Sequence, residues 1–169
     1  MRKTICFLVI FVMSGLFLFA DENKKNTIGL DMGAGYTYTS NPKLKGGHFE
    51  LGLSLYRGNV YVQNRLLFRA TGLEIDGLDS TILTLSDKLV FGRGSSGSGI
   101  YVYIEGGAGY YGNSEKEFFT DDALVYSFGF GGGLELGGIY FETGYLGQKI
   151  TSNFPLSGIV FQTGWRVRF

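Results

Sequence analysis

Apolar side chains recur at every second position through most of this chain after residue 26, and this period constrains the fold more than any other feature. A period of two is typical of a β-strand, whose successive side chains point to opposite faces. No stretch after residue 26 shows the 3.6-residue period of an amphipathic helix. The 28 glycines occur with only two prolines and with 15 Phe and 11 Tyr, a mixture unlike that of disordered chains. The sequence therefore predicts an all-β domain.

Eight segments carry the alternation. They are residues 28–38, 48–56, 60–70, 83–91, 100–110, 124–135, 139–145 and 159–169. Each segment has one strongly apolar face, and its other face mixes glycine, tyrosine and charged residues. In the fifth segment, for example, Ile100, Val102 and Ile104 alternate with Tyr101 and Tyr103. The segments predict eight consecutive strands in one domain.

The connectors between these segments differ in length. Residues 57–59 and 137–138 predict tight hairpin turns, and Gly92 to Gly99 predicts a soft Gly/Ser turn. Longer connectors are expected at 40–47, 72–79, 112–122 and 147–157. Long and short connectors alternate, so an up-and-down arrangement would place all the long ones at one end.

The N-terminal residues predict export. Residues 1–20 combine Arg2 and Lys3 with an apolar run and end in Leu18-Phe19-Ala20, the pattern of a cleaved signal peptide. The alternative is a membrane anchor. The apolar run from Ile5 to Phe19 is shorter than the run of about 20 residues that a spanning helix needs. The single cysteine, Cys6, lies inside this segment, so residues 21–169, the predicted barrel domain, have no thiol for a disulfide or a metal site.

An exported chain with apolar strand faces is expected to place those faces in a bilayer. Only helices and closed barrels satisfy every backbone hydrogen bond there. We therefore predict a closed antiparallel eight-stranded up-and-down transmembrane β-barrel, with apolar residues facing lipid and a filled polar lumen. Aromatic residues at outward positions near both ends are typical of the two interfacial girdles of such barrels. They are Tyr36, Tyr38, Phe49, Phe68, Tyr110, Tyr126 and Tyr145 at one end, and Phe91, Trp165 and Phe169 at the other.

The apolar faces also constrain how neighbouring strands pair. Pairing Leu55 with Val62, Leu66 with Leu85, Phe91 with Ile100, and Leu134 with Ile139 keeps every apolar face on one side. A shift of one residue would turn each apolar face inward, whereas a shift of two would not. The pattern therefore leaves registers two residues away open.

The last segment ends with aromatic and apolar residues at alternate positions. Phe161, Trp165, Val167 and Phe169 resemble the signal by which the barrel-assembly machinery recognises outer-membrane barrels. Residues 21–169 as a whole resemble the small OmpA/OmpX-type barrels. This resemblance implies the bacterial outer membrane as location, membrane lipid as surroundings, and periplasmic chaperones during biogenesis. It also implies termini and short turns in the periplasm, with the longer connectors outside the cell.

Ten charged residues fall on the inward face, five of each sign. They are Asp31, Glu50, Arg65, Arg69, Lys88, Glu105, Glu135, Glu142, Arg166 and Arg168. Buried charges persist when they are paired, so we interpret them as an ion-pair network that fills the lumen. The alternative is a narrow ion pathway lined by the same residues. Inward glycines such as Gly33 and Gly131 would make room for long side chains.

Asn64 and Asp87 break the outward apolar pattern. In the register proposed above they face each other near the middle of the membrane. A local bulge that turns Asp87 inward, a hydrogen-bonded pair, or a contact with another protein or a second copy would each account for them.

The sequence offers little for catalysis. His48 and the Asp79-Ser80 pair resemble residues of lipid A palmitoyltransferase barrels, but that family begins with an amphipathic helix that residues 21–27 are too few to form. One histidine without a cysteine makes no metal site. The glycines at 129–133 lack the Gly-Lys-Ser/Thr ending of a phosphate-binding loop. The balance of acidic and basic residues gives no basic surface for nucleic acid. We expect no enzyme and no cofactor.

These features predict a non-enzymatic outer-membrane barrel with a structural or surface-interaction role. Connectors 112–122 and 147–157 are candidate contacts for an extracellular partner, and Phe118 and Phe119 are the candidate contact residues. The second hypothesis is a narrow channel or small-solute transport barrel of the OmpW type. The third is a lipid A-modifying acyltransferase-type barrel.

Overall fold

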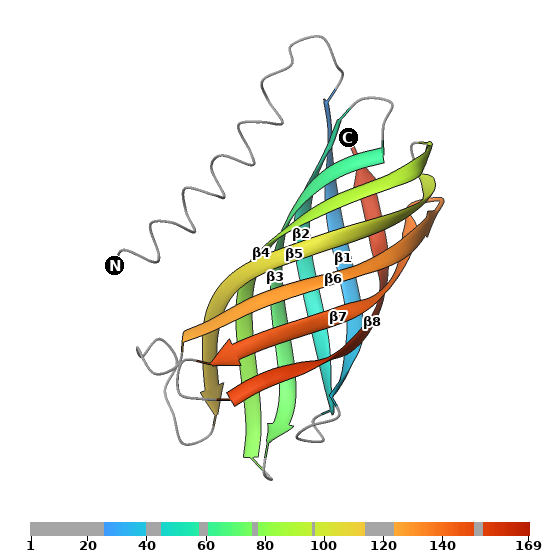
Figure 1. The fold of residues 1–169 in the computed structure, drawn as a ribbon. Coiled ribbons are helices and arrows are strands. Elements are labelled where there is room, and N and C mark those ends of the chain that lie inside the picture. The colour runs from blue at the N-terminus through green and yellow to red at the C-terminus, as the bar shows by residue number, and fades with distance from the viewer. Residues whose placement is uncertain are drawn as a thin grey trace.

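The computed structural model is a closed antiparallel barrel in which each strand pairs with its neighbours in the sequence and β8 closes on β1 (Figure 1). It describes residues 26–39, 45–57, 61–75, 78–95, 97–113, 124–150 and 154–169. The strands are β1 Asn26–Thr39, β2 Lys45–Arg57, β3 Tyr61–Ile75, β4 Leu78–Ser95, β5 Ser98–Asn113, β6 Leu124–Leu136, β7 Ile139–Ile150 and β8 Phe154–Arg168. The predicted eight-stranded fold is confirmed. Among the described residues no helix is long and apolar enough to cross a membrane.

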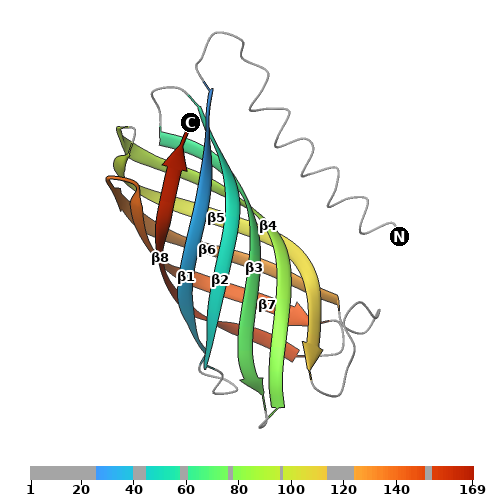
Figure 2. The ribbon, with the colours of Figure 1, turned by 180° about the vertical axis from the view of Figure 1, so that it is seen from behind.

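The strands are staggered around the barrel. Following register partners from Gly29 on β1 leads around all the strands to Gly158 on β8, whose partner on β1 is Thr39. The shear is therefore ten residues, from position 29 to position 39 of the same strand. A stagger of this kind requires strongly tilted strands, which Figures 1 and 2 show from the front and from behind. The tilt carries side chains from distant parts of the sequence to the same height in the lumen.

All four predicted strand pairs are displaced by two residues. Leu55 pairs with Asn64 and Leu66 with Asp87. Phe91 pairs with Val102, and Leu134 with Phe141. The displacement keeps every apolar face outward, which is why the alternation could not detect it.

Turn geometry decides the register. Leu136 and Ile139 pair directly and leave only Gly137 and Gly138 between them, with φ of 60° and 85°. Positive φ at both central residues is the requirement of a type I′ hairpin turn, which glycine meets without strain. The predicted tight turn at 137–138 is therefore confirmed. Gly97, also at positive φ, lies in the equally short connection from β4 to β5.

Two of the four expected long connectors are wrong. Pairing of β3 with β4 continues to Ile75 opposite Leu78, so most of 72–79 is strand and only residues 76–77 connect them. Residues 147–150 belong to β7 and 154–157 to β8, which reduces the connector expected at 147–157 to 151–153. The connector after β5 spans 114–123 and that after β1 spans 40–44. We call the end with these four connectors the loop end and the opposite one the turn end.

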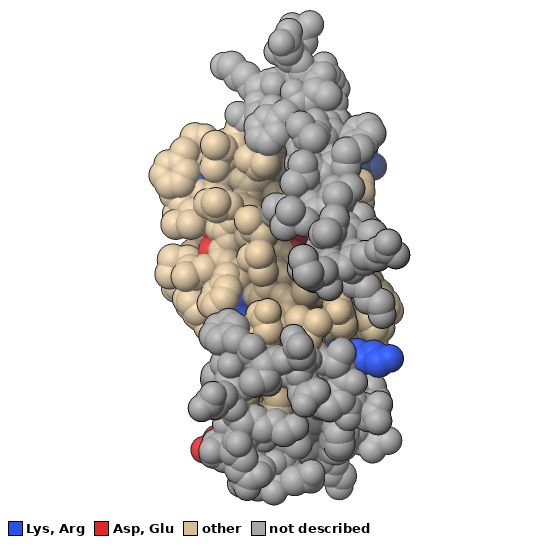
Figure 3. All heavy atoms as spheres, turned by 90° about the vertical axis from the view of Figure 1, so that its left-hand side faces the viewer, with Lys and Arg blue, Asp and Glu red and all other residues tan. Residues whose placement is uncertain are grey.

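The outer face is apolar. Large hydrophobic side chains such as Ile104, Phe130 and Phe161 are more than half exposed. The described middle of the barrel in Figure 3 shows mainly uncharged side chains. Of the predicted girdle residues, Tyr36, Tyr38 and Phe49 are exposed toward the loop end, and Phe91, Trp165 and Phe169 toward the turn end. Phe68 is exposed at the middle of β3 instead.

The inner face is buried and largely polar, as predicted, but it also holds apolar residues that the alternation did not assign to it. Leu73, Ile82 and Val125 form a cluster near the loop end, with Tyr111 packed against it. Val90 packs with Tyr101 and Tyr103 farther toward the turn end. The lumen is therefore filled by a mixed core rather than by polar groups alone.

Candidate functional site

The ten charged residues expected in the lumen come from all eight strands. Nine are buried, and the side chain of Arg168 at the turn end is 15% exposed. By strand they are Asp31 on β1, Glu50 on β2, Arg65 and Arg69 on β3, Lys88 on β4, Glu105 on β5, Glu135 on β6, Glu142 on β7, and Arg166 and Arg168 on β8. They form two groups along the barrel.

Glu142 is the centre of the first group. Its carboxylate binds Arg65 from β3, and it accepts from Lys88 Nζ of β4 at 2.8 Å and from Tyr101 Oη of β5 at 2.7 Å. β7 is not adjacent to any of these strands in the sheet. The bonds therefore span the lumen and tie one wall of the barrel to the other.

Arg69 completes this central group. Its guanidinium binds Glu50 at 3.0 Å and Glu105 at 2.7 Å, and Lys88 lies 3.6 Å from Glu105. Gln162 on β8 donates to Glu50 at 3.0 Å and also to Glu142. Three cations and three carboxylates thus balance one another, as buried charges require.

The second group lies nearer the turn end. Arg166 binds Asp31 and Glu135, and Arg168 binds Glu135 as well. Ser54 donates to the same Asp31 carboxylate at 3.4 Å. Two cations again balance two carboxylates, so each group is neutral by itself.

Aromatic rings fill the space around the charges. The guanidinium of Arg166 lies 4.8 Å from the ring centre of Tyr140, and Lys88 Nζ lies 4.4 Å from that of Tyr103. Glycines on adjacent or nearby strands make room for the rings. A Cβ on Gly33 would lie 2.2 Å from Tyr140 Oη, and one on Gly131 would lie 2.7 Å from Tyr103 Cζ.

His48 is not bonded to the Asp79-Ser80 pair, although together they resemble residues of palmitoyltransferase barrels. His48 points into the lumen, where its ring bonds Thr37 at 3.4 Å and Gln162 at 3.2 Å. Ser80 bonds Tyr111 at 3.2 Å, and Asp79 is exposed on the outer side of β4. His48 is thus held by the lumen network rather than by an Asp-Ser pair. No group of three metal-ligating side chains occurs in the described parts of the chain.

Asn64 and Asp87 do not face each other. Asn64 pairs with Leu89 and Asp87 with Leu66, so the two lie diagonally on neighbouring strands. The register runs from Tyr61 to Ile75 without an extra residue, which contradicts the bulge interpretation. The amide nitrogen of Asn64 makes no hydrogen bond to any described atom, which contradicts the hydrogen-bonded pair. The contact interpretation stays a hypothesis.

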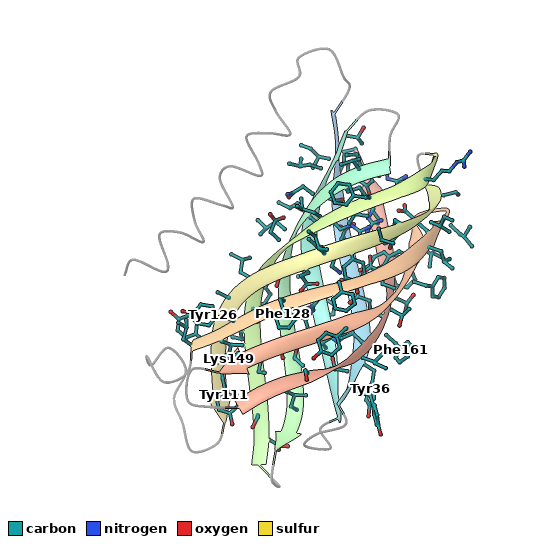
Figure 4. All side chains as sticks on the ribbon, in the orientation of Figure 1. Tyr36, Tyr111, Tyr126, Phe128, Lys149 and Phe161 are labelled. Carbon is teal, nitrogen blue, oxygen red and sulfur yellow. The ribbon has the colours of Figure 1, made fainter. Side chains whose placement is uncertain are left out.

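The four residues of the predicted assembly signal lie on the outer side of β8 or directly after it. Phe161, Trp165, Val167 and Phe169 all point outward and are at least half exposed. Tyr36 on β1 pairs with Phe161 on β8, and both project from the barrel wall in Figure 4. Phe118, Phe119 and the expected signal peptide at 1–20 lie outside the described residues.

Three neutral residues of the network were not predicted as part of it. Tyr101, Tyr140 and Gln162 each donate to a buried carboxylate of the central group. Their inward position was evident from the alternation. Their partners depend on the shear, which sequence spacing does not reveal.

An apolar exterior, a charged and filled interior and a closed sheet define the class of small transmembrane β-barrels. Among solved structures the chain is similar to the outer membrane protein Ail of Yersinia pestis, determined in a phospholipid bilayer nanodisc. The identity is 16%, the match covers 85% of this chain and 100% of Ail, and the TM-score is 0.50. At that identity the likeness shows the fold. No family model and no curated protein sequence matches the chain.

Proposed function

We propose that the chain is a non-enzymatic barrel of a bacterial outer membrane, exported by the segment 1–20, with a structural role in the envelope. The bonds from Glu142 to Arg65 and Lys88 carry this proposal. They occupy the centre of the lumen and connect opposite walls, as expected of a barrel whose interior stabilises it. The similarity to a membrane barrel and the apolar exterior support the location.

A filled lumen is expected to pass little solute. Purified protein added to planar lipid bilayers should give no discrete conductance steps at 100 mV of either sign. The double variant R65A/E142A keeps the lumen neutral and removes the cross-lumen bond, so it is the positive control and should conduct more than the wild type. Discrete steps from the wild type would overturn the proposal and favour the narrow-channel hypothesis.

Acyl transfer is tested separately. Lipid A from cells with and without the protein should have the same mass, because His48 is bonded to Thr37 and Gln162 within the lumen and not to the Asp79-Ser80 pair. A change in lipid A mass by one acyl chain would contradict the non-enzymatic assignment if the change is absent in the His48→Ala variant.

Surface interaction through the connectors at 114–123 and 151–153, which are what the structure leaves of the loops expected at 112–122 and 147–157, is a further part of the proposal. We infer that Phe118 and Phe119 contact a partner or the membrane interface, because aromatic residues among charges suit such contacts. The variant F118S/F119S should fold normally and bind less of any extracellular protein that the wild type retains. Unchanged binding would remove these residues from the proposed contact.

Outward aromatic residues of β8 are the proposed assembly signal. Phe169 and Trp165 are among the most exposed hydrophobic residues of the barrel, at 79% and 66%. The Phe169→Ser variant should accumulate in the periplasm while still refolding in detergent at the wild-type yield. Membrane insertion of this variant at the normal level would contradict the proposal.

A further inference from the structure

Small polar side chains line the lumen between the central charges and the loop-end apolar cluster. Ser86 on β4 stands opposite Gly107 on β5, Gly107 opposite Ser127 on β6, and Ser127 opposite Gln148 on β7. A Cβ on Gly107 would lie 2.4 Å from Ser86 Oγ and 2.8 Å from Ser127 Oγ. The hydroxyls of Ser86 and Ser127 therefore approach Gly107 from its two neighbouring strands.

These polar groups are buried without a partner. Ser86 is 1% exposed and Ser127 4%, and neither hydroxyl makes a hydrogen bond to any described atom. The same holds for Gln148 Nε2 and for the hydroxyls of Thr71 and Thr84. Buried polar atoms in folded proteins are nearly always hydrogen-bonded, to protein or to ordered water. Five such atoms on neighbouring strands need a common explanation.

The surroundings limit what can satisfy them. Toward the loop end lies the apolar cluster of Leu73, Ile82 and Val125. Toward the turn end, the three cations and three carboxylates of the central group balance one another, so the group leaves no net charge facing the hydroxyls. A ligand here must be small and neutral, and it must both donate and accept hydrogen bonds, because hydroxyls do both and the Gln148 amide nitrogen donates.

We propose that this part of the lumen is a water-binding site, with one water bridging Ser86 Oγ and Ser127 Oγ above Gly107. The two oxygens can be no farther apart than the two distances from the Gly107 Cβ position combined. One water spans such a gap with two O–H···O bonds of about 2.8 Å each. Further waters bonded to Thr71, Thr84 and Gln148 would make this a small buried cluster. The inference goes beyond the proposed function and does not depend on it.

A crystal structure of the full chain, at a resolution that shows ordered water, tests the site directly. We expect a water within hydrogen-bond distance of both Ser86 Oγ and Ser127 Oγ. The methyl group of the Gly107→Ala variant would project between the two hydroxyls and leave no room for that water, so the variant should lack it. Density in the wild type showing the two hydroxyls bonded to each other or to strand carbonyls, with no water between them, would overturn the proposal.

A double-mutant cycle tests the same site if the glycine variant does not fold. Ser86→Ala and Ser127→Ala should not be additive, because removing either hydroxyl removes the shared water bond. We expect the coupling to change the unfolding equilibrium constant by about threefold or more. Ser86→Ala combined with Ser54→Ala, a serine bonded to Asp31 instead, is the control and should be additive. An additive Ser86–Ser127 cycle would contradict a bridging water.

Discussion

Arg65 and Lys88 are direct register partners on β3 and β4, yet both bind the carboxylate of Glu142 on β7 across the lumen. Like charges in directly opposed positions repel each other. The carboxylate of Glu142, on the opposite wall, compensates the positive charges of both Arg65 and Lys88. Glu142 is therefore the residue on which the central group depends most.

Neutralising Glu142 should destabilise the barrel strongly. Glu142→Gln keeps the side-chain shape but removes the charge that compensates Arg65 and Lys88. Breaking a buried ion pair from one side costs about 3–5 kcal/mol, so we expect a loss of that order in urea unfolding in lipid vesicles, followed by the fluorescence of Trp165. The exposed acid Asp79 provides the control: Asp79→Asn should change stability by less than about 0.5 kcal/mol. Equal effects of the two variants would mean that the pairing contributes little.

Gly33 should tolerate a methyl group only when Tyr140 is shortened. Its Cβ would lie 2.2 Å from Tyr140 Oη, so Gly33→Ala should cost about 1–3 kcal/mol through overpacking. Tyr140→Phe removes the oxygen that clashes, together with its 3.3 Å bond to Glu50. The double variant should therefore be more stable than the sum of the single effects predicts. Strict additivity in the same unfolding assay would show that the ring does not limit this position.

A charge on the outer face should be tolerated near the turn end and not in the middle. Ile104 and Ile100 point outward from the same strand, and Ile100 lies close to the turn. Ile104→Arg should cost about 2–4 kcal/mol in phospholipid vesicles, and Ile100→Arg about 0–1 kcal/mol, because the penalty falls with distance from the bilayer midplane. Equal losses of stability in the two variants would contradict a bilayer midplane that lies nearer Ile104 than Ile100.

Replacing Asn64 and Asp87 together by leucine tests their role on the outer face. Polar groups facing lipid are unfavourable, so N64L/D87L should fold and be at least as stable as the wild type in vesicles. Oligomeric state is measured by crosslinking in the same vesicles. A wild-type dimer that disappears in the variant would identify these residues as a contact between two copies, whereas a loss of stability without a dimer would assign them a structural role.

The alternation of side chains alone determined the strand number, the outward faces and the set of inward charges. It could do so because lipid outside and a closed lumen inside impose opposite polarity on successive residues of each strand. The alternation assigned Ile100 and Ile104 to the outer face, and Glu105 and Glu142 to the inner face, without any knowledge of which residues pack beside them.

Only the tertiary structure decided which of these residues meet. The two-residue turn at Gly137 and Gly138 sets the register two residues away from the one that the apolar pattern suggested, and the alternation is blind to a shift of two. The shear then raises each strand relative to the next, which brings Glu142 to the height of Arg65 and Lys88. The extension of β3 to Ile75 and the start of β4 at Leu78 also depended on pairing, since glycine-containing segments carry little strand signal of their own. The polarity of a position can be read from its own residue. Which side chains meet across the lumen depends instead on the register of every strand that lies between them.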